Sequence, residues 1–178
     1  FVESREINEE ITNNHNPSIA KLQELKLMMV RSKMLINNWA YQETAPENED
    51  KVALQKLTSE EYPKLKLELQ SLASTWEDTS KFEVSELYNG IENLWTLHDF
   101  VRQSLSGIES YNDAITKWSA QSMVEEGGEI DIQTDQIIIV LNQLIESKKY
   151  RTEEITDEML AKFENVQIVI RTLGFALT

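Results

Sequence analysis

The two histidines of this 178-residue chain are the side chains best suited to bind a metal or haem, or to transfer protons. Di-iron bundles place a glutamate three residues before a ligand histidine. Here Thr12 precedes His15 and Trp95 precedes His98 at that distance. His98 falls at a core position of a helical pattern, and we interpret it as a hydrogen-bonded core histidine rather than a ligand or a pH sensor. We predict no catalytic residue and no metal-binding residue.

Other motifs that carry chemistry are missing from the sequence. There are no cysteines, which excludes disulfides, thiolate metal sites and cysteine nucleophiles. No nucleophile elbow, P-loop or dinucleotide fingerprint occurs. One acidic run lacks the spacing of a calcium-binding EF-hand loop, and we interpret it as a solvated turn: Glu125, Glu126, Glu129, Asp131 and Asp135. We therefore predict that the protein is not an enzyme and uses no cofactor.

Cationic and amide side chains on the helical segments offer a different chemistry. A half-buried guanidinium can hold a ligand carboxylate through two parallel hydrogen bonds. Arg31 lies within two turns of an Asn-Asn-Trp run, but it can equally pair with one of the 31 acidic residues of the chain. If the chain binds a small ligand, we expect the contacts to come from Arg31, Asn38, Trp39 and Arg102.

A helical pattern over residues 16–42 must position several of these side chains. Asn16 is suited to cap a helix, and Pro17 is suited to its first turn. One apolar stripe has the three-and-four spacing of a buried helix face: Ile19, Leu22, Leu25, Met29, Ile36 and Trp39. A second stripe indicates burial against another copy of the chain, and we expect a homodimer interface at Leu27, Val30, Met34 and Tyr41.

The rest of the sequence is also helical in pattern, with few glycines and prolines to interrupt it. After an acidic loop at residues 43–50, the pattern predicts three further core helices, at about 51–79, 81–106 and 154–178. The first of these contains Pro63, where we expect a kink. Four helices of similar length predict an all-α fold, an up-down-up-down antiparallel four-helix bundle with both chain ends on one side.

Two interpretations stay open for residues 107–153. They form a helical hairpin inserted at the far end of the bundle, or they belong to two extended helices, 84–125 and 130–178. The second interpretation is possible because no glycine or proline lies between Glu129 and Leu173. Gly107 is the most plausible interruption of the first extended helix.

Composition limits the number of domains and the kinds of partner. The length fits one domain, 1–178. A net charge of −14 argues against nucleic acid and against anionic lipid as partners. No apolar run approaches the roughly 20 residues that span a bilayer. The last residues, 166–178, become steadily more apolar, which fits either a helix cut just before a membrane span or a C-terminal helix that docks on its own core. The chain starts at Phe1 rather than Met, which we interpret as a processed or excised form.

The order of several segments has a recognisable layout. The first long helix is opened by Asn16-Pro17-Ser18-Ile19 and carries the run from Ser32 to Trp39; a helix with Tyr62-Pro63 follows the acidic loop, and the chain ends with Glu164-Asn-Val-Gln and Leu173-Gly174. This layout resembles the extracytoplasmic four-helix-bundle sensor domains of bacterial two-span receptors, which include chemotaxis-type receptors and HAMP-linked kinases and phosphatases. The resemblance covers the whole chain, but no ligand residue of the family can be carried over. The length of 107–153 departs from a plain four-helix layout and would suit a relative with two stacked bundles.

The resemblance implies a periplasmic domain of an inner-membrane protein, tethered by flanking spans and dimerised through its first and last helices. A small molecule or a periplasmic protein would bind and shift one helix against another by about 1–2 Å. The first and last helices would pack together, with Ile170 beside Ile19 and Met159 beside Ile36. The alternative function is a soluble helical protein–protein interaction module without a membrane partner. An enzyme or cofactor bundle is a third class.

Overall fold

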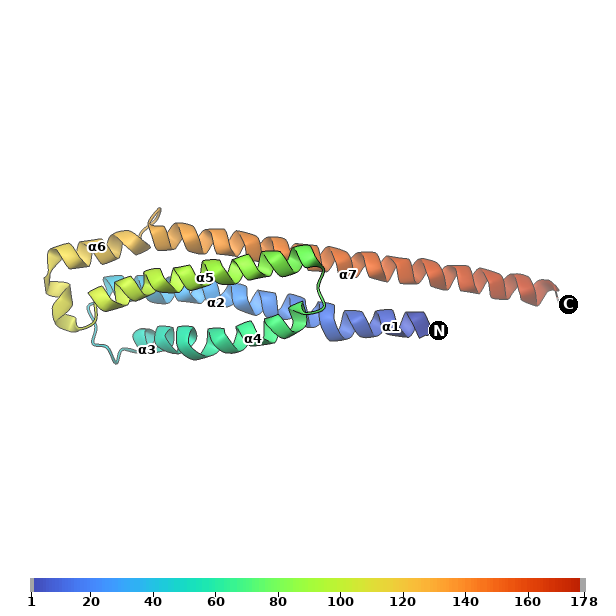
Figure 1. The fold of residues 1–178 in the computed structure, drawn as a ribbon, viewed down its shortest axis with the longest axis horizontal. Helices are drawn as coiled ribbons and strands as arrows, with labels where there is room; N and C mark the ends of the chain where they lie inside the picture. The colour runs from blue at the N-terminus through green and yellow to red at the C-terminus, as the bar shows by residue number, and fades with distance from the viewer. Residues whose placement is uncertain (1, 177–178) are drawn as a thin grey trace.

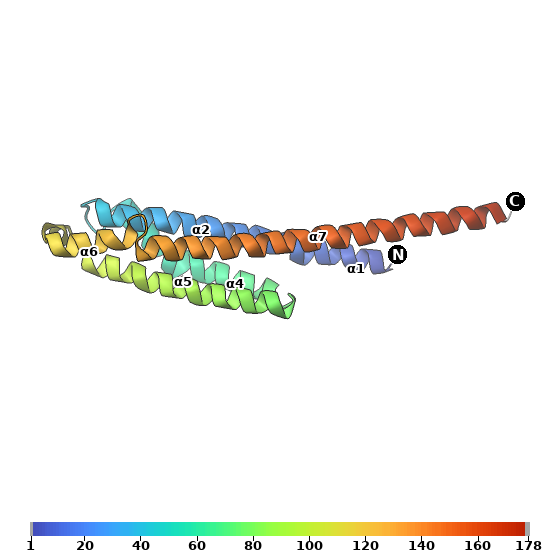
Figure 2. The same cartoon turned by 90° about the horizontal axis from the view of Figure 1, so that it is seen from above.

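The part of the chain that the structure describes forms four long helical rods that lie alongside one another (Figures 1 and 2). The computed structural model describes the backbone of residues 2–176 and the side chains of residues 5–162, 164 and 165. No strand occurs in the described backbone. The predicted all-α fold class is therefore confirmed.

The rods are continuous or nearly continuous helices. The first consists of α1 (Val2–Glu10), a π-helical turn η1 (Ile11–His15) and α2 (Asn16–Tyr41). The second consists of α3 (Glu49–Lys56), a π-helical turn η2 (Leu57–Glu61) and α4 (Tyr62–Ala73). The third is α5 (Asp78–Ser104). A 3₁₀ turn, η3 (Ile108–Asn112), leads to the fourth rod, which consists of α6 (Ala114–Val124) and α7 (Glu129–Ala176).

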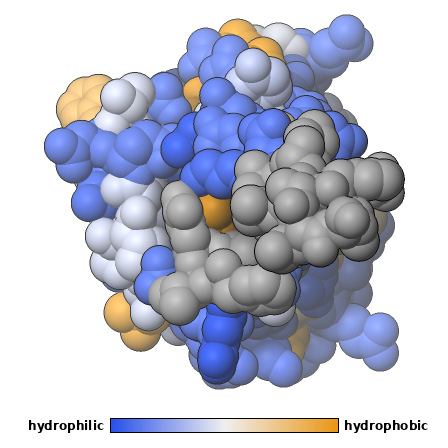
Figure 3. Space-filling view, turned by 90° about the vertical axis from the view of Figure 1, so that its right-hand side faces the viewer, coloured by the Kyte–Doolittle hydropathy of each residue, from blue (hydrophilic) through white to orange (hydrophobic). Residues whose placement is uncertain are grey.

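The two ends of the molecule differ. At the distal end, on the left of Figure 1, lie η3, α6 and the loop between α2 and α3. At the opposite end, on the right of Figure 1 and called the near end below, α1 and the last part of α7 project beyond the other helices. Figure 3 looks at the near end, where most of the coloured surface is hydrophilic, in keeping with the net charge of −14.

Both π-helical turns end two residues before a proline. A proline donates no backbone hydrogen bond, and its ring collides with the carbonyl four residues earlier in an α-helix. In each rod the residue before the proline reaches one residue further back: Asn16 N–H bonds Ile11 O, and Tyr62 N–H bonds Leu57 O. The wider turn makes room for the proline ring. The expectation of a helix that continues through Pro63 is confirmed, with the π turn as the local distortion.

Three residues of types that often cap helices do not act as caps. Asn16 was expected to start a helix, but His15 before it is already helical and no side-chain cap is formed. Thr134 and Thr156 lie inside α7, where their hydroxyls donate to the carbonyls of Ile130 and Thr152, 2.6 and 2.8 Å away. A threonine inside a helix satisfies its hydroxyl on the preceding turn, so its sequence signature resembles that of a cap.

The predicted boundary at residue 154 is wrong, because α7 is one helix of 48 residues, about 70 Å long at 1.5 Å per residue. The interpretation with a continuous helix from about residue 130 is right for this part of the chain. The predicted partner helix 84–125 is wrong, since α5 ends at Ser104 and Gly107 has extended backbone angles. Residues 107–153 are thus a short connection, α6 and the first half of α7.

The seam between α2 and α7 fixes how the last rod lies on the first. Lys33 of α2 forms ion pairs with Asp131 and Asp135 of α7, with N–O distances of 2.6 and 2.7 Å. The α6–α7 turn holds Asp131 in place, because its carboxylate accepts the Gly127 N–H at 2.8 Å. Gly127 has a φ of +80°, which favours glycine.

This register contradicts the predicted packing of the last helix on the first. Ile36 lies one turn from Lys33, so its level on α7 is that of Asp131 and not of Met159. At the other end of α2, Ser18 accepts a hydrogen bond from Trp76, and Lys148 of α7 lies over that tryptophan. The other side chains of the predicted seam lie outside the described residues: Phe163, Val166, Ile170 and Leu173.

The predicted first stripe of α2 forms the centre of the core. Leu22, Leu25, Met29, Ile36 and Trp39 are buried, and Ile19 is half-buried. The buried residues of α7 that belong to the same core are Ile130, Ile137, Leu141, Leu144 and Ile145. Periodicity therefore predicted the inward face of α2 correctly.

We expect Met29→Ala to lower the free energy of unfolding by about 2–5 kcal/mol, because it leaves a cavity in a fully buried site. Met34→Ala is the matched control on the same helix, since Met34 is 53% exposed and its truncation should change stability by less than about 0.5 kcal/mol. Chemical denaturation of the two variants measures the difference. Equal destabilisation would contradict the assignment of the core face.

Candidate functional site

Side chains from four elements meet at the distal end around Trp39. The indole is buried, and its Nε1 donates to the carbonyl of Leu105 at 3.0 Å. The Tyr111 hydroxyl donates to the carbonyl of Trp39 at 2.5 Å. These two bonds attach the end of α2 to the connection between α5 and α6. Burial, with a smaller contribution from Glu43, raises the pKa of Tyr111 to about 12, so the hydroxyl stays protonated.

A lysine lies between these two aromatic rings. Lys51 of α3 is 1% exposed, and its ammonium lies 5.1 Å from the Trp39 ring centroid and 4.9 Å from that of Tyr111. It donates to the carbonyl of Thr44 at 2.7 Å. Burial lowers the pKa of Lys51. Cation–π attraction to two rings and one strong hydrogen bond compensate for the lost hydration.

A hollow of about 360 Å³ lies beside the tryptophan, lined by Trp39, Pro46, Gln55, Asp99, Arg102, Gln103 and Ser106. The guanidinium of Arg102 lies 5.9 Å from the Trp39 ring centroid. It contacts Asp99 and the hydroxyl of Thr58, both at 3.3 Å and both through the same nitrogen, Nη1. A guanidinium has five N–H donors. The rest of its edge is available to an acceptor, and a ligand carboxylate is the group that fits it best.

The structure brings together two of the four expected ligand residues. Trp39 and Arg102 line the hollow. Asn38 does not line it and donates to Asp50 at 2.7 Å, which ties α2 to the start of α3. Arg31 is two turns away and pairs with Glu61 at 3.0 Å. For Arg31 the alternative of pairing with an acid of the chain is therefore right, and the residue is not part of the hollow.

Sequence reasoning missed Lys51, Tyr111 and Gln55, which also surround the tryptophan or the hollow. No motif marks them, because they come from two separate elements, α3 and η3, that only the packing of the rods brings together. The sequence contained one signal. Lys51 follows the acidic loop and falls on a core position of the helical pattern, three residues before Leu54. A buried lysine needs a specific environment, so this position was informative.

His98 occupies the core of α5, as predicted, but it is not hydrogen-bonded. It is fully buried, and neither ring nitrogen has a partner within the described structure. Its ring stacks edge-on against Trp95 at 5.1 Å between centroids, and Trp95 contacts Tyr62 in the same way at 5.6 Å. Burial, followed by the nearby charge of Arg102, lowers the pKa of His98 to about 3. The imidazole is therefore neutral at ordinary pH.

The acidic run proposed as a solvated turn is partly used in packing. Asp131 and Asp135 pair with Lys33, whereas Glu125, Glu126 and Glu129 are exposed. Among the residues whose side chains are described, no group of three or more histidine and acidic side chains is arranged to hold a metal ion.

The second stripe of α2 is on the outside of the molecule. The exposed fractions are 69% for Leu27, 49% for Val30, 53% for Met34 and 47% for Tyr41. These four residues, called the α2 stripe below, follow one another along the helix with gaps of three, four and seven positions. Their exposure is what a contact with a second copy requires, and the dimer stays a prediction.

We expect the stability of the protein to fall with pH in a way that depends on His98. In the folded protein the imidazole of His98 takes up a proton only when the pH falls to about 3. In the unfolded chain it does so when the pH falls below about 6.5. Unfolding therefore takes up one proton in this range, and stability should drop by up to about 1.4 kcal/mol per pH unit as the pH falls.

Comparison with His98→Phe isolates this effect, because other titrating groups, such as Glu77, are common to both proteins. The gap between the two unfolding free energies should be constant above pH 7 and should change in favour of the variant towards pH 4. A gap that does not depend on pH, measured by urea denaturation, would show that native His98 takes up the proton.

Comparisons with known proteins provide no family for this chain. No protein-family model, no curated protein and no solved structure matches it. Support for any function must therefore come from the geometry described above and from the layout of the sequence.

Proposed function

We propose that this chain is the extracytoplasmic, periplasmic sensory domain of a bacterial transmembrane receptor that binds a small molecule or a partner protein. The observation that carries the proposal is α7. This single helix of 48 residues starts beside the distal end, packs along α2 and α5, and leaves the near end next to α1. A rigid rod of this kind can carry a displacement from one end of the domain to the other.

The distal hollow is the proposed ligand site. Its walls come from α2 through Trp39, from α3 through Gln55, and from α5 through Asp99 and Arg102. A ligand that bridges these walls would change the position of α2 relative to its neighbours. Because Lys33 couples α2 to α7 by two ion pairs, a shift of about 1–2 Å along this seam would reach the near end.

The proposal includes the finer architecture. The four rods would form the up-down-up-down antiparallel four-helix bundle of such sensors, and flanking membrane spans would tether α1 and α7 through a HAMP linker to a chemotaxis-type or enzymatic output module. Among the described residues, no helix is both long enough and apolar enough to cross a bilayer. The spans would therefore be separate segments next to this domain.

The proposed receptor is a homodimer that associates through the α2 stripe. The exposed apolar side chains of Leu27, Val30, Met34 and Tyr41 follow one another along α2, in a chain with a net charge of −14. Parallel packing of two α2 helices would bring each residue of the stripe close to its own copy, as in a coiled-coil seam.

The second candidate function, a soluble helical interaction module, is favoured by the same α2 stripe. The stripe would then contact another protein, and α7 would carry no signal. Location in the cell and self-association separate the two candidates.

We expect Leu27→Cys in the full-length protein to form a disulfide-linked dimer on mild oxidation, since the domain has no other thiol. Leu67→Cys is the matched control: Leu67 is 68% exposed but lies on α4, away from the α2 stripe, and it should stay monomeric on a non-reducing gel.

The same control variant reports the location. In cells with a permeabilised outer membrane, a membrane-impermeant maleimide should label Leu67→Cys before the inner membrane is broken, and the protein should sediment with membranes. Labelling only after lysis, with the protein in the soluble fraction, would favour the interaction module.

We also expect a cross-link between α2 and α7 to lock the output of the full-length receptor. Cysteines at Lys33 and Asp135, joined by oxidation or a short bismaleimide, would prevent sliding along the seam. The matched control is a pair at Lys66 and Glu92, which form an ion pair between α4 and α5. A receptor that still responds with the first pair joined would contradict the sliding mechanism.

A further inference from the structure

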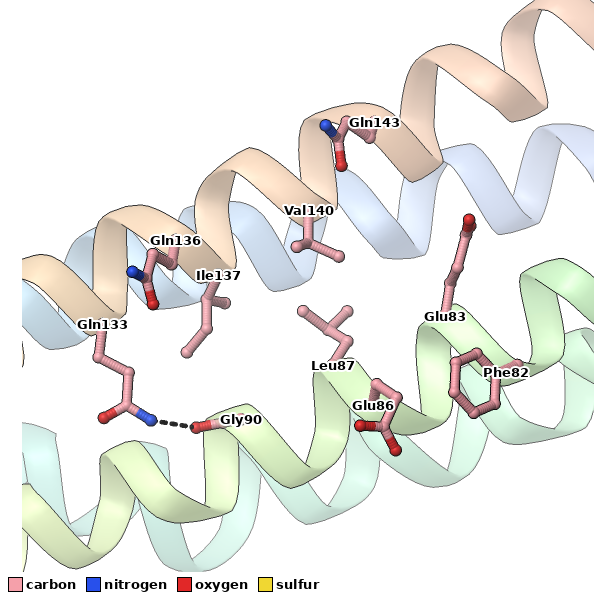
Figure 4. A pocket seen from close by; sticks show the side chains of 10 residues that line it. All are labelled: Phe82, Glu83, Glu86, Leu87, Gly90, Gln133, Gln136, Ile137, Val140 and Gln143. Atoms are coloured by element: carbon pink, nitrogen blue, oxygen red, sulfur yellow. Dashed lines mark hydrogen bonds between the residues drawn. The ribbon is translucent and has the colours of Figure 1, made fainter.

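A groove of about 370 Å³ runs along the outside of α5 and α7 (Figure 4). Its floor is apolar: Leu87 of α5 faces Ile137 and Val140 of α7 across the gap. Its rim is polar or aromatic and consists of Phe82, Glu83, Glu86, Gln133, Gln136 and Gln143. This volume falls in the range of small-molecule sites, which combine an apolar floor with a few polar groups.

A glycine in the middle of α5 helps to keep the groove open. Gly90 lines it, although glycine is the poorest helix former after proline. The backbone does not require glycine there, because Gly127 is the glycine with a positive φ among the described residues. Packing does not require it either, since an added Cβ would lie 3.8 Å from Ile137, an ordinary contact. The missing side chain leaves space on the floor of the groove.

The charge of the rim indicates the kind of ligand. Asn89 donates to Glu86 at 3.2 Å, and Gln133 donates to the Gly90 carbonyl at 3.1 Å. Neither Glu83 nor Glu86 forms an ion pair within the described part of the chain. The positive charge that acts on Glu83 is that of Lys148, whose ammonium is held 3.2 Å from Glu77. Two exposed carboxylates that form no ion pair within the described residues, beside an apolar floor, favour a cation with an apolar body.

We propose that this groove binds a small organic cation, an ammonium or guanidinium group on an aliphatic or aromatic body. The body packs on Leu87, Ile137 and Val140, and the charge lies at the rim near Glu83 and Glu86. The ring of Phe82, two-thirds exposed at the rim, adds a cation–π contact. The site is separate from the distal hollow, and binding to it does not depend on the proposed role at a membrane.

Calorimetric titration of the purified protein with 2-phenylethylammonium tests the proposal at low ionic strength. We expect millimolar or tighter binding, and binding of 3-phenylpropionate, which has the same ring and the opposite charge, to be roughly tenfold weaker or absent. Glu83→Gln with Glu86→Gln should weaken binding of the amine several-fold. Glu109→Gln with Glu125→Gln is the matched control: it changes the net charge equally and should leave the affinity within twofold.

A second variant separates the groove from general charge attraction. Gly90→Ala should raise the melting temperature, as alanine favours the helix, and yet should weaken amine binding by filling the floor.

Several results would overturn the proposal. They are no binding of the amine at millimolar concentration, equal binding of the amine and the carboxylate, and equal loss of affinity in the two charge-matched variants. A change in sedimentation of Glu83→Gln with Glu86→Gln, with amine binding intact, would assign the groove to a protein partner instead.

Discussion

The packing of α2 against α7 is the contact on which the rest of the structure depends. Among the described residues these two helices make the most extensive contact, and their apolar residues meet in the centre of the core. Lys33 closes the outer edge of the seam with two carboxylates, which fixes the axial position of one helix on the other. The groove next to α5 is lined by α7, and the distal hollow lies beside the end of α2.

Two buried lysines mark the ends of the packed region. Lys51 lies against Trp39 at the distal end, and Lys148 lies 4.3 Å from the ring centroid of Trp76 towards the near end. Burial lowers the pKa of both ammonium groups, and for Lys148 the carboxylate of Glu77 partly opposes that effect. Each tryptophan also anchors another element through its indole N–H, on Leu105 O or on the Ser18 hydroxyl. Aromatic rings thus supply at both ends the contacts that a buried cation needs.

The sequence predicted what depends on local periodicity. The inward stripe of α2, the helix that continues through Pro63 and the all-helical character of the described residues follow from spacing and composition. The start of α7 near residue 130 followed from only one of the two open interpretations, because threonines inside a helix carry the same signal as helix caps. The predicted register of α7 on α2 was wrong for the same reason. A helix expected to start at residue 154 placed Met159 beside Ile36, where the structure has Asp131.

The candidate site was predictable only in part. Trp39 and Arg102 come from patterns that the sequence displays, but Lys51 and Tyr111 join them through tertiary packing alone. The missing partners of His98 were also unforeseeable. A core position predicts burial, whereas hydrogen bonding depends on which side chains of the facing helices reach the ring, and here Trp95 and Arg102 lie nearby without bonding it.

The π turn before Pro17 has a consequence for the direction in which the chain leaves the domain. Such a turn amounts to one extra residue inserted into an α-helix. One residue corresponds to a rotation of about 100° and a rise of about 1.5 Å. Loss of a single residue from Ile11–His15 would therefore turn α1 about its own axis while α2 stayed in the core. The rotation of α1 about its own axis is therefore set by the π turn and Pro17, and not by the residues that pack the core.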